Sequence, residues 1–107
     1  MELTKREILG VRASLLETIT DHFFHGNLRL VEESKRLFSE LDAAYHDESS
    51  SPRTFHFDRF GLGVLDRTFS HVGAVIEEWE FQTRIRLTVD EFQGLADRVR
   101  ALCDESD

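Results

Sequence analysis

Four residues in the first quarter of the chain have side chains that could carry chemistry: Glu17, Asp21, His22 and His25. Glu17, Asp21 and His25 recur every four residues, which would stack them on one face of a helix. Carboxylates and imidazoles in this arrangement can bind Zn²⁺ or iron. Metal sites of this kind in helical bundles need matching ligands from other helices, and no Glu-x-x-His pair in the rest of the chain supplies them. The sequence therefore favours a solvated polar face, with no metal and no cofactor.

Nucleophilic chemistry has weaker support. Ser70 and His71 are neighbours on a predicted helix, so their side chains diverge by about 100°. The single cysteine, Cys103, lies on an apolar helical stripe and is expected to be a small buried hydrophobic residue. One cysteine also excludes an internal disulfide. The sequence thus favours a protein that is not an enzyme, and a small metal-dependent enzyme or metal-binding protein using the Glu17 cluster is the alternative.

The segment 77–87 combines a hydrophobic period of two with alternating charge. A strand there would turn one set of residues inward, namely Trp79, Phe81, Thr83, Ile85 and Leu87. The intervening glutamate, glutamine and arginine side chains would face outward. The alternation predicts a strand, and the alternative is a continuation of the preceding helix.

A strand of this composition can pair with a second copy of itself. In an antiparallel pair centred on Gln82, Glu78 would lie opposite Arg86 and Glu80 opposite Arg84. This arrangement is compatible with a homodimer through strand 77–87. The alternatives are that mixed charges protect an edge strand from aggregation, or that residues 55–57 occupy that edge. The interface candidates are Glu78, Trp79, Glu80, Phe81, Gln82, Arg84, Ile85 and Arg86.

The elements that would position these residues are mainly helical. Thr4 with Glu7, and Thr88 with Glu91, have the spacing of capping boxes, while Asn27 and Asp58 are further candidate caps. The hydrophobic spacing predicts four helices, over residues 5–25, 28–45, 59–73 and 89–103. A second alternating stretch, 54–58, is predicted to pair with 77–87 in a small antiparallel sheet. The fold class is therefore α+β, and an all-α four-helix bundle is the alternative.

The chain is expected to be one domain over residues 1–107. It would consist of a helical hairpin (1–46), an exposed linker (46–53), a strand-helix-strand-helix unit (54–103) and a short acidic tail (104–107). The linker contains three consecutive serines and the only proline. Neither half has an evident means of burying its apolar face alone, so the linker is not a domain boundary.

The charge balance indicates which classes of binding partner to expect. The chain has 21 acidic and 13 basic side chains, for a formal net charge of −8. Nucleic acids and anionic membranes are therefore not expected as partners, because lysine and arginine dominate binding to both. A basic protein partner is favoured by charge. No apolar run follows the charged N-terminus, so a cytoplasmic location is expected.

The stretch 55–102 resembles small uncharacterised bacterial proteins in which a strand leads into a capped helix. The residues carrying the resemblance are the helix LDRTFSHVGAVIEEW and the run EFQTRIRLTVDEF, especially Glu80-Phe81-Gln82-Thr83-Arg84. The resemblance implies glycine where this chain has Arg86, and it implies no activity. Taken together, these observations favour an adaptor, an accessory protein or an inhibitor of the immunity type.

Overall fold

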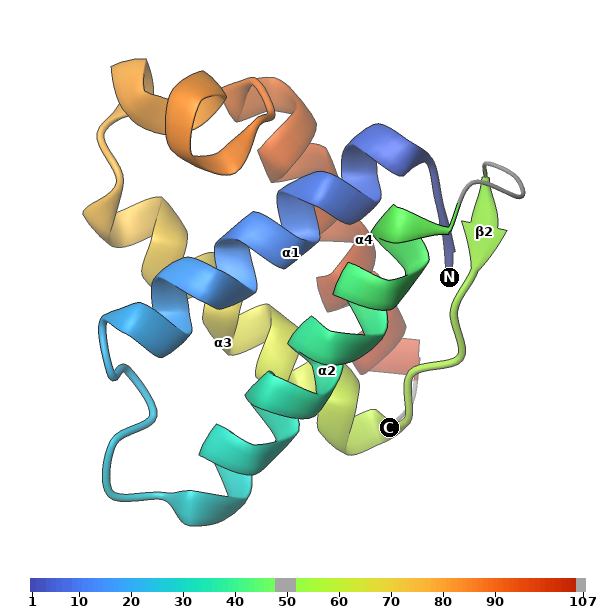
Figure 1. The fold of residues 1–107 in the computed structure, drawn as a ribbon, viewed down its shortest axis with the longest axis vertical. Coiled ribbons are helices and arrows are strands. Elements are labelled where there is room, and N and C mark those ends of the chain that lie inside the picture. Colours follow the sequence, from blue (N-terminus) through green and yellow to red (C-terminus); the bar gives the residue numbers. More distant parts are fainter. Residues whose placement is uncertain (48–51, 106–107) are drawn as a thin grey trace.

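The computed structural model describes residues 1–47 and 52–105, and most of that length is helical (Figure 1). The long helices are α1 (Lys5–Thr20), α2 (Leu28–His46), α3 (Arg59–Val75) and α4 (Val89–Glu105). Two short helical segments, η1 (Glu78–Glu80) and η2 (Phe81–Ile85), lie between α3 and α4. Within the described residues, no helix is both long and apolar enough to cross a membrane. The predicted predominance of helix is confirmed.

Each long helix begins beside a polar side chain that accepts a hydrogen bond from a backbone N–H of the first turn. The hydroxyls of Thr4 and Thr88 accept from the amide three residues later, at 3.2 and 3.1 Å. In both cases the glutamate at that position accepts from the threonine N–H, which completes the predicted capping boxes. Asn27 and Asp58 cap α2 and α3 with their side-chain oxygens, as predicted. These four caps account for where the helices start.

A two-stranded antiparallel sheet is present, but its strands are not those predicted. Strand β1 (Glu2–Leu3) pairs with β2 (Arg53–Thr54), in the register that places Glu2 opposite Thr54. The N-terminal ammonium of Met1 donates to the carbonyl of Phe55 at 2.7 Å and extends this contact. Figure 1 shows the N-terminus beside β2. The prediction that 54–58 pairs with 77–87 is therefore wrong. Residues 48–51 of the predicted linker and 106–107 of the predicted tail lie outside the described part of the chain.

Helix α1 ends at Thr20, five residues before its predicted end. The N–H of His22 donates to the carbonyl of Ile19, and the N–H of Phe23 donates to that of Thr18, at 3.1 and 3.2 Å. These two bonds form a Schellman motif with His22 in the left-handed conformation, at φ 55°. His22 thus ends the helix at the position that glycine usually takes. Gly26, four residues later, serves the turn into α2 with φ 88°.

The predicted strand 77–87 is wrong, because the segment is helical. Glu77 is extended, η1 and the π-helical η2 follow, and Arg86 ends the segment with φ 71°. Phe81 and Ile85, four residues apart, are 4% and 0% exposed, so they occupy the buried side of a helical turn. Trp79, predicted to face inward, is 78% exposed. The antiparallel self-pairing across Gln82 consequently has no strand that could form it.

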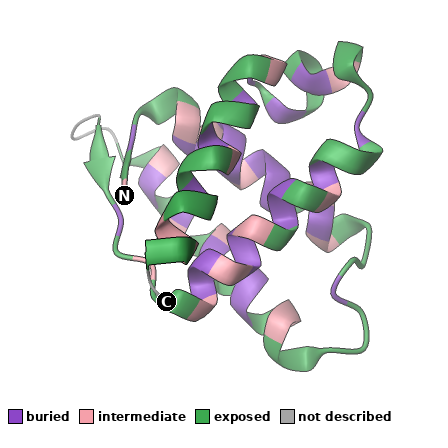
Figure 2. Cartoon of the chain, turned by 180° about the vertical axis from the view of Figure 1, so that it is seen from behind, coloured by how far each residue is buried: buried purple, intermediate pink, exposed green. Residues whose placement is uncertain are grey.

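The hydrophobic core receives side chains from all four long helices and from η2. Figure 2 shows the buried residues on the helix sides that face one another. Helix α1 packs against α2, α3 and η2, while α3 packs against α4. Leu15, Leu37, Leu65 and Leu95, one from each long helix, are at most 1% exposed. Both predicted halves of the chain therefore contribute to one core cluster.

Candidate functional site

Two of the four residues considered as metal ligands are held in other interactions. Glu17 forms an ion pair with Arg84, whose Nη2 lies 2.6 Å from Oε2 of the carboxylate. Asp21 Oδ2 lies 3.0 Å from Nε2 of His71 on α3. Glu17 thus links α1 to η2, and Asp21, the residue that follows α1, links the end of this helix to α3.

The two histidines of the predicted cluster lie beyond the helix that was expected to present them. Because α1 ends at Thr20, His22 and His25 occupy the turn between α1 and α2. There they line a pocket beside the start of α2. Among residues 1–47 and 52–105, no group of three or more His, Cys, Asp or Glu side chains is placed to hold a metal ion. Of the four predicted ligands, only His22 and His25 line this pocket.

The residues considered for nucleophilic chemistry are Ser70, His71 and Cys103, and their surroundings differ. Ser70 is exposed on α3, and its neighbour His71 stacks on Phe23 with a ring separation of 4.3 Å. Cys103 is partly buried on α4 and packs against the core. These contacts are structural ones between helices.

The most exposed large hydrophobic side chain of the described structure lies in the segment that the sequence singled out. Trp79 is 78% exposed. We call the exposed side chains of this segment the η surface; its members are Glu77, Glu78, Trp79, Gln82, Thr83, Arg84 and Arg86. Of the predicted interface candidates, Phe81 and Ile85 are buried and cannot meet a partner. Glu80 is half-buried, and the other five candidates are exposed: Glu78, Trp79, Gln82, Arg84 and Arg86.

The buried side of this segment is fixed to the core by close packing. The ring of Phe81 meets that of Phe92 edge-on, with centroids 4.9 Å apart. Leu87, at 0% exposure, packs directly over Gly10 of α1, where any added Cβ would overlap its side chain. Gly10 therefore allows the η segment to approach α1 closely.

Ion pairs hold the segment on its outer side. Arg84 binds both oxygens of Glu17 through Nε and Nη2, and its Nη1 donates to Glu80 at 2.8 Å. Hydrogen bonds from Arg84 to Glu17 and then to Glu80 raise the arginine pKa above its usual range. One bidentate pair and a second carboxylate thus connect η2 to η1 and to α1.

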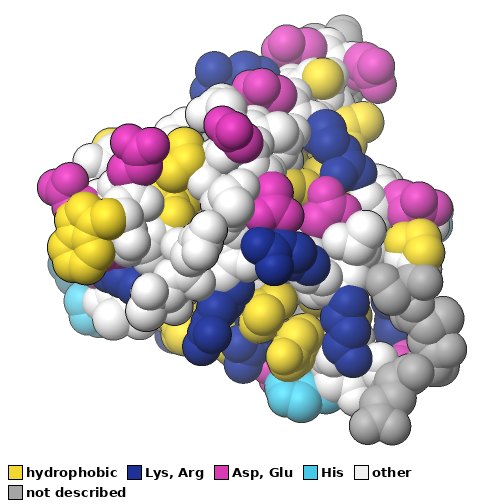
Figure 3. Space-filling model, turned by 90° about the horizontal axis from the view of Figure 1, so that it is seen from above, with side chains coloured by type: hydrophobic (Ala, Val, Ile, Leu, Met, Phe, Trp, Pro, Cys, Tyr) yellow, Lys and Arg dark blue, Asp and Glu magenta, His cyan; other side chains and the backbone are white. Residues whose placement is uncertain are grey.

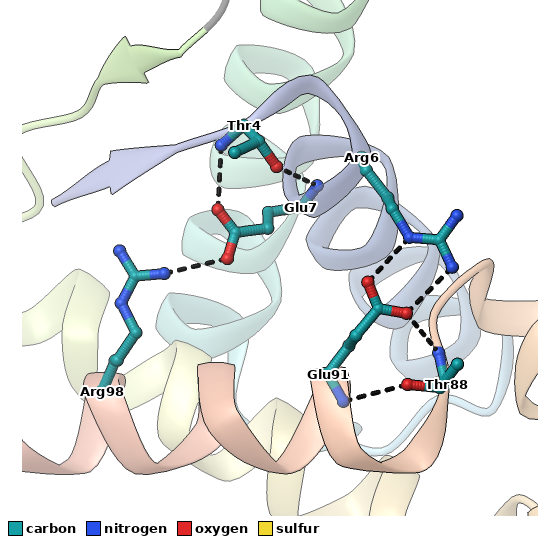
Figure 4. A network of polar contacts seen from close by, with 6 residues as sticks. All are labelled: Thr4, Arg6, Glu7, Thr88, Glu91 and Arg98. Atoms are coloured by element: carbon teal, nitrogen blue, oxygen red, sulfur yellow. Dashed lines mark hydrogen bonds and ion pairs between the residues drawn. The ribbon is translucent and has the colours of Figure 1, made fainter.

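The start of α4, which follows η2, is held to α1 by the glutamates of the two capping boxes. Each of these glutamates also binds an arginine of the other helix (Figure 4). Arg6 of α1 binds Glu91 of α4 with two bonds of 2.8 Å, and Arg98 of α4 donates to Glu7 of α1 at 2.9 Å. The hydrogen bond from Arg6, aided by the Thr88 backbone, lowers the pKa of Glu91 to about 2. The start of α4 is therefore fixed relative to α1.

Acidic residues surround Trp79. Glu77, Glu78 and Asp90 are all exposed. Glu78, Trp79 and Asp90, together with Thr83, line a shallow pocket of about 500 Å³. Figure 3, which views this end of the molecule, shows hydrophobic and acidic side chains next to each other at its left. This part of the η surface is hydrophobic at its centre and negative at its rim.

The other side of the η surface is basic. A second open pocket, of about 480 Å³, is lined by Lys5, Arg6 and Arg86, with Leu9 and Tyr45 among its other residues. Basic side chains group at the lower centre of Figure 3. Gln82 lines both pockets and lies where the acidic and basic parts meet.

The sequence singled out this segment but predicted the wrong set of its side chains to be buried. The reading as a strand buried Trp79 with Phe81 and Ile85, whereas helical turns bury the last two alone. The i, i+4 spacing of Phe81 and Ile85 and the glutamates on both sides of Trp79 were the available signals for helical turns with an exposed tryptophan.

The chain matches no protein-family model, no curated protein and no solved structure.

Proposed function

We propose that this chain acts without catalysis by binding another protein, as an adaptor, an accessory protein or an inhibitor of the immunity type. The binding surface is the part of the η surface around Trp79. The partner presents a segment rich in lysine or arginine. The observation that carries the proposal is the 78% exposure of Trp79 on a tightly held segment.

The exposed tryptophan supports binding energetically. A tryptophan side chain can bury about 150–250 Å². At about 25 cal/mol per Å², covering the exposed four-fifths of Trp79 gives about 3–5 kcal/mol before the costs of association are subtracted. Tryptophan is also enriched among the residues that dominate protein interfaces. One residue of this kind can therefore be the anchor of a specific contact.

The charges around Trp79 support a basic partner. Glu77, Glu78 and Asp90 form no ion pair with any other described residue, so their charges are available to a ligand. A lysine or arginine side chain can lie over the indole while these carboxylates pair with it or with its neighbours. The net charge of −8 would further speed the encounter with a basic protein.

The tight anchoring of the segment supports a preorganised surface. Phe81, Ile85 and Leu87 are buried below it, and Arg84 fixes it laterally to Glu17. Little conformational freedom is then lost when a partner binds, which lowers the cost of association.

A site-specific photo-crosslinker at position 79, introduced in the native host, would test the proposal. The matched control is the same crosslinker at Leu28, a 71% exposed apolar residue at the start of α2, far from η1 and η2 (Figure 1). Support requires a partner crosslinked at 79 and not at 28, through a segment rich in lysine or arginine. Products that are the same at both positions would overturn the proposal.

Measuring the affinity of variants for the purified partner then separates the contribution of the tryptophan from that of the acidic residues around it. Trp79→Ala should weaken binding by at least about tenfold, because hot-spot truncations cost roughly 2 kcal/mol or more. Glu78→Lys should weaken it more strongly at low salt than at high salt, whereas Glu32→Lys on the exposed side of α2 should not. Equal affinity of the Trp79→Ala variant would refute the assignment. A crosslinked dimer of this chain would identify a second copy as the partner.

A further inference from the structure

A pocket at the opposite end of the molecule from the η surface has a different chemical character. It lies at the turn between α1 and α2 and has a volume of about 430 Å³. Pockets for small molecules in proteins are commonly about 300–1,000 Å³. The size of this pocket therefore suits a ligand of small-metabolite dimensions.

The pocket has an apolar wall. Ile19 of α1, Phe24 of the turn and Val31 of α2 line it, and Phe24 is only 6% exposed. Leu28, which also lines the pocket, is 71% exposed and would be covered by a ligand. A hydrocarbon or aromatic group entering here would remove apolar surface from water on both itself and these residues.

All the titratable side chains that line the pocket are basic. They are His22, His25 and Lys35, and none of the lining residues is Asp or Glu, although acidic residues outnumber basic ones in the chain. No side-chain hydrogen bond or ion pair joins any of these three to another described residue. One ammonium and two imidazoles are thus available to the same ligand, and together they favour a negative group.

The conformation of His22 is a separate observation that points to the same site. Its φ of 55° is in the left-handed region, which carries a steric cost for a residue with a Cβ. Glycine at this position of a Schellman motif avoids that cost. Strained residues held in place by their surroundings cluster at binding sites. Here the strained residue lines the pocket.

We propose that this pocket binds a small organic acid, in which a carboxylate is attached to a short hydrocarbon or aromatic body. The carboxylate pairs with Lys35 and with the imidazoles of His22 and His25. The apolar body lies against Ile19, Phe24 and Val31. This activity is independent of protein binding through Trp79, because the two surfaces share no residue.

Benzoate and hexanoate are suitable probes, with benzyl alcohol and hexanol as neutral controls of similar shape. Titration of the full chain, followed by the amide signals in two-dimensional NMR, should give saturable shifts at the α1–α2 turn and the first turns of α2. Each acid should bind at least about tenfold more tightly than its alcohol, since charge-assisted hydrogen bonds are the stronger ones. Equal binding of acid and alcohol, or no saturable shift up to roughly 50 mM, a concentration well above a millimolar Kd, would overturn the proposal.

Two variants test the assignment without endangering the fold. Lys35→Met keeps an exposed helical position and should weaken benzoate binding by about tenfold, whereas Lys5→Met, in the basic pocket beside the η surface, should not change it. His22→Gly removes one imidazole and relieves the strained turn, so it should raise the melting temperature while weakening benzoate binding. Wild-type affinity in both the Lys35 and His22 variants would refute the site. None of these results bears on the crosslinking at position 79.

Discussion

Substituting Gly10 by alanine tests the packing that places the η segment against α1. Gly10 lies in the middle of α1, and a Cβ added there would overlap the side chain of Leu87. Leu87 is completely buried, so it cannot move aside into solvent. Gly63 in α3 and Gly94 in α4 are also helical, but a Cβ at either would meet no atom within 4 Å. The three helical glycines therefore differ in whether an added Cβ would meet a neighbouring side chain.

The expected size of the effect follows from two opposing terms. In a helix interior, alanine is favoured over glycine by about 1 kcal/mol. Forcing an extra carbon into a packed core costs about 1–3 kcal/mol. Gly94→Ala and Gly63→Ala should therefore stabilise the protein by up to about 1 kcal/mol, whereas Gly10→Ala should change stability by about 0 to −2 kcal/mol. The separation between Gly10 and its controls is the quantity that the structure predicts.

Urea unfolding followed by circular dichroism measures all three variants under the same conditions. A double-mutant cycle adds the decisive comparison, because Leu87→Ala removes the side chain that the new Cβ would meet. In that background Gly10→Ala should lose its penalty, with a coupling of about 1 kcal/mol or more between the two positions. If Gly10→Ala stabilises the protein as much as Gly94→Ala does, Leu87 does not pack on Gly10 and the arrangement of the η segment is wrong.

Three further substitutions test local features. Arg86→Gly should raise the free energy of unfolding by up to about 1 kcal/mol, because Arg86 has φ 71°; a lower urea midpoint would contradict this. Thr68→Val should leave stability unchanged or raise it by about 1 kcal/mol, since the buried Thr68 hydroxyl has no partner among the described residues; a clear loss in thermal unfolding would point to an unseen bond. Arg6 lowers the pKa of Glu91 from its ordinary 4.5 to about 2, so this pair stabilises the fold above pH 4.5 and the effect disappears as the pH falls toward 2. Arg6→Gln should flatten that part of the pH–stability curve, and an unchanged curve would exclude the pair as its source.

The helices were predictable because their signals are local. Each cap uses a side chain and an amide three residues apart, so Thr4, Asn27, Asp58 and Thr88 could be recognised from spacing alone. The end of α1 was missed for a related reason. A Schellman motif normally shows itself by glycine or asparagine, and here His22 occupies that position while Gly26 follows four residues later.

Two features depend on contacts between residues far apart in the sequence. They are the small sheet and the ion pairs between the capping-box glutamates and the arginines of the other helix. Strand β1 joins β2 across 50 residues of sequence, and both strands are only two residues long. Such strands show no alternating pattern that a sequence could reveal. In the same way, the bonds from Arg6 to Glu91 and from Arg98 to Glu7 follow from how α1 and α4 lie together, and not from any spacing.

The error over residues 77–87 shows what separates a strand from helical turns in a short segment. Positions 81 and 85 satisfy both patterns, because a spacing of four is two strand periods and about one helical turn. Position 79 distinguishes them: a strand buries it with 81 and 85, whereas a helix turns it away. If every hydrophobic residue is assumed to be buried, a tryptophan at position 79 favours the strand, because only the strand buries that position. Its exposure, between Glu78 and Glu80, is the feature that the fold leaves unexplained and that a binding partner would account for.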